Sequence, residues 1–298
     1  MPDLAIVSRW LGYVAALGLT GAATFQAVVK TRIQREFPET SAALLARTRR
    51  VAIVLAVLLI IAALLRLQAQ VHSLVDPGEP ITRDLYRAML GTGWGHSWIL
   101  QWGAALAGLV VLVIVRDTRV LVPLALLVAG LGPFTGHASE NPLGRFFGVS
   151  LHAIHQLGGG AWLGTLAMVV LVGYGGTRRI DDTARHRVIA RLVEAFSPIA
   201  LTGVGIAVVA GLVLSYQYVG SFSALLSSSY GTTLLIKVGM LALTAGLGAW
   251  NWRRVRPTLG EAGASARLFR SATLELIVGT LLLGATALLV SLEAPNLI

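Results

Sequence analysis

The segment VAIVLAVLLIIAALL, residues 51–65, contains no polar side chain. About 20 mostly apolar residues are enough for a helix to cross a membrane, and similar runs recur from one end of the chain to the other. Of its 298 residues, 55% are hydrophobic and only 13% are charged, and the mean hydropathy is +0.75. A soluble domain usually carries about twice this charged fraction. The sequence therefore predicts an integral membrane protein and excludes a water-soluble enzyme.

The apolar runs predict an all-α fold with eight transmembrane helices. They are continuous rather than alternating, which argues against the strands of a membrane barrel. The predicted spans cover residues 4–29, 51–72, 96–115, 119–136, 147–175, 194–217, 231–252 and 268–292. The first run is too long for a cleavable signal peptide and no basic residue precedes it, so we expect it to be a span.

The basic residues predict the orientation of these helices. Most of the 24 lysines and arginines fall in the links on one side, at residues 30–50, 116–119, 178–191 and 253–270. By the positive-inside rule this side faces the cytoplasm, so both termini are predicted to face outward. The same asymmetry accounts for the net charge of +10, and nucleic acid is not expected as a partner.

Two halves of four spans each are predicted, at residues 1–136 and 137–298. The pattern Ala88-Met89-Leu90 followed by Trp94-Gly95 recurs as Ala224-Leu225-Leu226 followed by Tyr230-Gly231. The constant offset of 136 also aligns Gln101 with Lys237, and Gly21 aligns more loosely with Gly164. Because four spans return the chain to the same side, the halves are predicted to be parallel repeats. Within the first half, the spacing of Ile81, Leu85 and Met89 predicts a short helix in the membrane interface.

The histidines are the strongest candidates for a binding site. Five of the six lie at predicted outer ends of spans, namely His72, His96, His137, His152 and His155. His152 and His155 are three residues apart and share a helix face. Imidazole binds both copper and haem iron, so these residues are predicted as ligands, with ordinary interfacial histidines as the alternative. Met89 is a candidate soft ligand whose alternative role is packing.

Other residue types limit the chemistry. The chain has no cysteine, which excludes disulfides and thiolate metal sites, and it carries no hydrolase or phosphate-binding motif. Arg66 and Lys237 are predicted to extend to the lipid headgroups. Glu275 is predicted to pair with Arg267 and Arg270 nearby in the sequence.

Several motifs resemble the CopD copper-resistance membrane proteins. They are Gly136-His137-Ala138, His152, His155, Trp162-Leu163-Gly164, Ser229-Tyr230-Gly231-Thr232, Leu235-Ile236-Lys237, Ala249-Trp250-Asn251, Leu274-Glu275-Leu276 and Leu289-Val290-Ser291. The resemblance covers about residues 136–292, whereas the first half fits mainly in its number of helices. It implies a protein of the bacterial inner membrane, with His137, His152 and His155 as copper ligands and Trp162 and Lys237 within the motifs.

The resemblance also implies copper transport with a separate periplasmic donor of the CopC type, since no such domain is fused here. Two other classes remain open on the residues alone. One is a quinone-linked membrane protein that binds haem b and transfers electrons, and the other is a copper-binding accessory protein that does not transport. A transporter is preferred to an enzyme, and the oligomeric state is not predicted.

Overall fold

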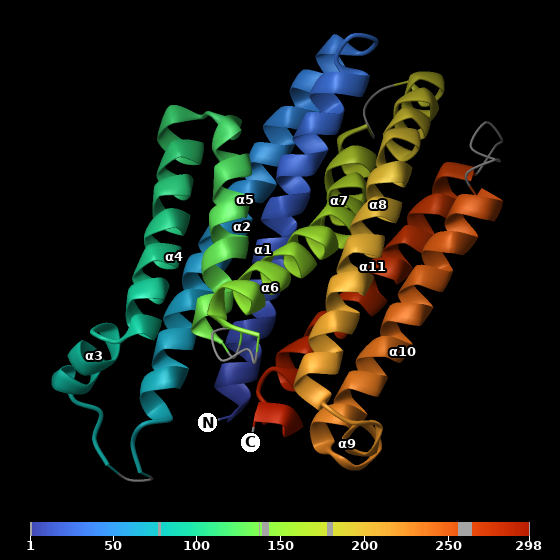
Figure 1. Ribbon diagram of the computed structural model, residues 1–298. Helices are drawn as coiled ribbons and strands as arrows, with labels where there is room; N and C mark the ends of the chain where they lie inside the picture. The colour runs from blue at the N-terminus through green and yellow to red at the C-terminus, as the bar shows by residue number, and fades with distance from the viewer. Residues whose placement is uncertain are drawn as a thin grey trace.

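The computed structural model describes residues 2–76, 79–136, 138, 143–177, 181–255 and 264–297. Every regular element in these ranges is a helix, and eight helices are long and apolar enough to cross a membrane, as predicted. The helices run side by side, and both termini lie at one end together with the short helices α3 and α9 (Figure 1). We call this end the terminal face.

The spans follow one another in chain order with two short helices between them. The long helices are α1 (Pro2–Val28), α2 (Pro38–His72), α4 (Gly93–Val110), α5 (Leu121–Leu131), α6 (Arg145–Gly159), α8 (Asp182–Val219), α10 (Ser229–Trp250) and α11 (Ala264–Leu289). The short helices α3 (Arg83–Leu90) and α9 (Phe222–Ser227) precede α4 and α10. The fifth span continues from α6 through a π-helical turn at Gly160–Gly164, α7 (Thr165–Met168) and a second π-helical turn at Val169–Tyr174.

Two spans begin about three turns earlier than predicted. Helix α2 starts at Pro38 rather than at residue 51, and α8 starts at Asp182 rather than at residue 194. Proline is favoured in the first helical turn, and the Asp181 carboxylate accepts hydrogen bonds from two backbone N–H groups of α8. Because these caps lie outside the apolar runs, hydropathy alone could not locate them. The basic residues at positions 47–50 and 185–191 therefore lie on helix rather than in loops.

The short helix predicted from Ile81, Leu85 and Met89 is present as α3. The Thr92 hydroxyl then accepts a hydrogen bond from Gly95 N at 3.1 Å and caps α4. In the second half, the Ser228 hydroxyl accepts from Gly231 N at 2.9 Å and caps α10. The two caps are separated by the predicted offset of 136.

The glycines that follow these caps occupy equivalent places. A Cβ on Gly95 would overlap the carbonyl oxygen of Met89, and a Cβ on Gly231 would overlap that of Leu225. Both positions therefore require glycine, because the preceding short helix packs directly on the backbone. This is the physical reason for the repeated pattern in the sequence.

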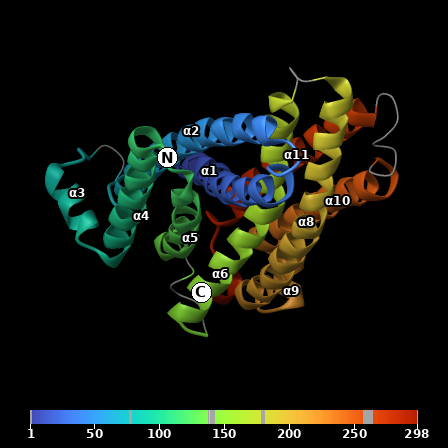
Figure 2. The ribbon, with the colours of Figure 1, turned by 90° about the horizontal axis from the view of Figure 1, so that it is seen from above.

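Helix α1 lies at the centre of the molecule. It contacts α2, α5, the fifth span and α11, and Figure 2 shows it between the two groups of helices. In the apolar 18-residue stretch of this span, 72% is buried inside the protein, a larger share than in any other described span. Trp10 Nε1 of this helix donates a hydrogen bond to the Thr280 carbonyl of α11 at 3.1 Å.

Small residues allow α1 and the fifth span to cross at backbone contact. A Cβ on Gly21 would overlap the carbonyl carbon of Gly164, and a Cβ on Gly164 would overlap the carbonyl oxygen of Leu17. Gly158 meets α8 at Gly203 in the same way. Close approach through small residues is the usual means of packing helices in a membrane, and here it fixes the position of α6 and its histidines.

Candidate functional site

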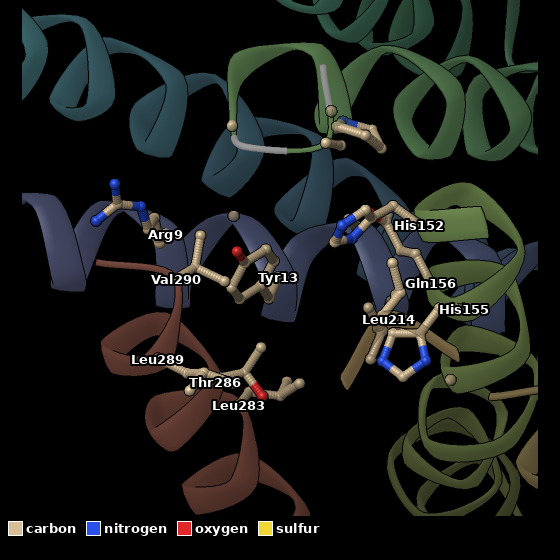
Figure 3. A pocket seen from close by; sticks show the side chains of 18 of the residues that line it. Arg9, Tyr13, His152, His155, Gln156, Leu214, Leu283, Thr286, Leu289 and Val290 are labelled. Atoms are coloured by element: carbon tan, nitrogen blue, oxygen red, sulfur yellow. The ribbon is translucent and has the colours of Figure 1, made fainter. Parts of the chain in front are cut away.

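A cavity of about 310 Å³ lies between the first four spans and the last four. Side chains of α1, α2, α4, α6, α8, α10 and α11 line it, and Figure 3 shows α1 and α11 facing α6 across it. Ligand sites are usually concave and mostly apolar, with a few convergent polar groups. Most of the lining here is apolar, so the polar side chains that reach the cavity define the candidate site.

Two of the predicted ligands, His152 and His155, reach this cavity from α6 (Figure 3). His155 Nδ1 lies 2.7 Å from the carbonyl oxygen of Ala207. A carbonyl oxygen only accepts hydrogen bonds, so Nδ1 must carry the proton and Nε2 is the ring nitrogen able to bind a metal. His152 Nε2 lies 3.0 Å from the Tyr218 hydroxyl. The pair is therefore oriented by α8.

The imidazoles also take part in helix packing. A Cβ on Gly211 would lie 3.0 Å from the His155 ring, and the His152 ring lies 5.8 Å from that of Tyr218. Both histidines therefore pack against α8 as well as lining the cavity. The sequence could not show this, because the contacts come from a helix more than fifty residues away.

The other predicted ligands lie elsewhere. His72 pairs with Gln68, with 3.1 Å between the nitrogens, and His96 is exposed on α4. Met89 is buried, and none of these three side chains lines the cavity. His137 lies outside the described residues. Within the described part of the chain, no group of three or more His, Asp or Glu side chains is arranged to hold a metal ion.

Three cationic side chains line the cavity, namely Arg9, Arg66 and Lys237, and none of the described lining residues is acidic. Arg66 Nη2 donates to the Thr135 carbonyl at 3.0 Å. Arg66 and Lys237 therefore face an internal cavity, whereas the sequence predicted that they extend to headgroups. The cavity also contains Gln156, which the sequence analysis missed although a polar residue beside His155 in an apolar span was a usable signal.

A second polar cluster joins three of the family-like motifs. The Glu275 side chain is 4% exposed and accepts hydrogen bonds from Trp162 Nε1 and Asn251 Nδ2, both at 3.3 Å. The Ser271 hydroxyl donates in turn to Asn251 Oδ1. The predicted ion pair with nearby arginines is not among the contacts of Glu275 in the described structure, because its carboxylate points between helices rather than along its own.

This network gives a stability prediction. Replacing Trp162 by Phe removes one of the two donors to a buried carboxylate, and we expect the free energy of unfolding to fall by about 1–3 kcal/mol. Replacing Glu275 by Gln keeps the shape but removes the charge, so the W162F change should cost less in that background. A double-mutant cycle on thermal or denaturant unfolding in detergent measures this coupling. Additive effects of the two changes would show that the charge of Glu275 adds nothing to the hydrogen bond from Trp162.

The eight apolar helices and the cavity between them are those of a multi-pass membrane protein with an internal cavity. The profile of the family "Copper resistance protein D" matches residues 190–289, and that of "Copper resistance protein D-like, N-terminal domain" matches residues 1–144. The chain belongs to the copper resistance protein D family, as its motifs suggested. The second profile extends the relationship to the first half, where the motifs were weak.

Two characterised relatives support this assignment. The chain is 29% identical to "Copper resistance protein D" of Pseudomonas syringae pv. tomato over 218 residues, which are 68% of this chain and 69% of the relative. It is 30% identical to "Copper transport protein CutJ" of Bacillus subtilis (strain 168) over 162 residues, 54% of this chain. That match spans only 28% of the length of CutJ. No solved structure matches the chain.

Proposed function

We propose that this protein carries copper across the bacterial inner membrane towards the cytoplasm, with His152 and His155 as the receiving ligands. The observation that supports this most strongly is the His155 imidazole, whose Nδ1–H is held by a carbonyl while Nε2 remains able to bind a metal. Imidazole suits copper in either common oxidation state. The names of both relatives, which refer to copper resistance and copper transport, are consistent with this role.

The proposed orientation places the terminal face in the periplasm. The links at the opposite face carry most of the basic residues, as expected for a cytoplasmic side. We further propose that residues 1–136 and 137–298 are parallel repeats, because the caps and glycines before α4 and α10 match at an offset of 136. The cavity would then lie between the repeats and receive copper from a separate periplasmic donor of the CopC type, with His137 as a further candidate ligand.

Haem b fits the described histidines less well. Two axial imidazoles must approach the iron from opposite sides, whereas His152 and His155 both project from α6 into one cavity. A non-transporting copper accessory protein uses the same ligands as a transporter. Only a measurement of copper flux across the membrane distinguishes the two.

The test is copper uptake by proteoliposomes that contain a trapped copper(I)-selective fluorescent chelator. We expect influx at least several-fold above protein-free vesicles, since the site has to release metal to the far side. Stoichiometric binding without influx would favour the accessory protein. A Soret absorbance band in the purified protein, without bound copper, would favour haem.

A further inference from the structure

The charge of the cavity does not suit a bare metal cation as its only occupant. Arg9, Arg66 and Lys237 line it, and none of the described lining residues is acidic. Tyr13 lines the same cavity. Charged side chains within a membrane protein are costly unless they pair or face a polar site. These cations need a negative charge to pair with, and the described lining residues supply none.

Hydrogen-bond donors in the same cavity are also left without acceptors. Nε and Nη1 of Arg9 are buried and have no hydrogen-bond partner among the described residues, and the same holds for Nε2 of Gln156. A buried unsatisfied donor costs about 1–3 kcal/mol, and more when it is charged. All three nitrogens are donors, so an occupant that satisfies them must present acceptor atoms.

The remainder of the cavity is apolar. Leu283 and Leu289 of α11, and Val290 directly after it, lie on the same side of the cavity below Arg9 and Tyr13 (Figure 3). The volume of about 310 Å³ is within the range of small-molecule sites and far above the space of one ion or water. A fully hydrated ion would leave this apolar surface in contact with water, which is unfavourable.

We propose that the cavity binds an acidic amphiphile, with a carboxylate or phosphate head at Arg9 and Arg66 and an apolar body along α11. A guanidinium group suits both heads because its planar donors form paired bonds to carboxylate or phosphate oxygens. The occupant comes either from the anionic phospholipids of the bilayer or from free fatty acids, which share this chemistry. Binding of this amphiphile requires no copper and is tested without it, so failure to bind leaves the copper site unaffected.

The experiment is native mass spectrometry of the full chain purified in a non-ionic detergent. The acidic probes are phosphatidylglycerol and laurate, and the matched probes without net negative charge are phosphatidylcholine and dodecanol. We expect one bound acidic molecule per chain, with at least about tenfold preference over its counterpart, the ratio that corresponds to 1.4 kcal/mol. Retention of phosphatidylglycerol alone identifies the phospholipid source, and retention of laurate alone identifies the fatty acid.

Two variants place the binding in the cavity. R9Q/R66Q should lose the preference for the acidic probes, because it removes both guanidinium groups from the site. R83Q/R87Q removes the same charge from exposed positions of α3 at the terminal face and should retain it. The proposal would be overturned if the unaltered chain bound the acidic probes no better than phosphatidylcholine and dodecanol. This comparison does not depend on whether R9Q/R66Q folds. Equal loss in both variants would also overturn it, since binding would then follow net charge alone.

Discussion

Replacing His152 and His155 together by Gln is expected to remove bound copper from the purified protein. Loss of second-shell partners of a metal typically weakens affinity 10–100-fold, so loss of both proposed ligands should weaken it by more than about 100-fold. Glutamine is preferred to alanine because the His155 ring fills space beside Gly211 and bonds the Ala207 carbonyl. Elemental analysis gives the copper content, and thermal unfolding shows whether the fold is retained.

The matched control is H72Q/H96Q, which changes the same number of histidines outside the cavity. We expect this variant to bind copper as the unaltered chain does. Full copper occupancy in H152Q/H155Q would reject the assignment of the site. Loss of copper only in the control would place the ligands at the outer ends of α2 and α4, as the sequence alone also allowed.

Replacing Gly164 by Ala is expected to prevent correct assembly of the helices. The added Cβ would overlap the carbonyl oxygen of Leu17, which is backbone and cannot rotate away as a side chain can. Overpacking of a core by small additions usually costs about 1–3 kcal/mol, and we expect a loss of at least about 3 kcal/mol here because two whole helices must separate. Fluorescence-detected size-exclusion chromatography and thermal unfolding in detergent measure the outcome.

Gly239 and Gly246 provide the control for this change. A Cβ at either position meets no atom within 4 Å, and Ala has the higher helix propensity. G239A and G246A should therefore be as stable as the unaltered chain or slightly more stable. If G164A proves as stable as these two variants, the backbone contact between α1 and the fifth span is not as close as described.

The sequence predicted those parts of the fold that depend on one segment at a time. Each apolar run identified its own span, and the spacing of Ile81, Leu85 and Met89 identified α3. The starts of α2 and α8 were missed because Pro38 and Asp181 act through local capping, which does not change hydropathy. The sequence pattern aligned Gly21 with Gly164 as equivalent positions of two repeats. The structure shows that the two residues are in contact. A comparison of sequence patterns does not distinguish equivalent positions from contacting ones.

The candidate site was harder to predict because it is assembled from many helices. His152 and His155 could be grouped by their spacing, since one helix carries both. Arg9 and Lys237 share the cavity with them although they are 228 positions apart in the printed sequence, and only helix packing brings them together. The partners of Glu275 were also missed, because its hydrogen-bond donors lie on two other helices. The sequence indicated only the arginines near Glu275 in the chain.

The central position of α1 has a consequence for how the protein is made. This helix leaves the ribosome before the other spans, but its bond from Trp10 to Thr280 requires a segment synthesised some 270 residues later. At about 5–20 residues per second, the interval is some tens of seconds. Throughout that time, the surface of α1 that later meets α6 and α11 must be covered by lipid or by the insertion machinery. The contacts between α1 and α11 therefore form only after α11 has been synthesised and has entered the membrane.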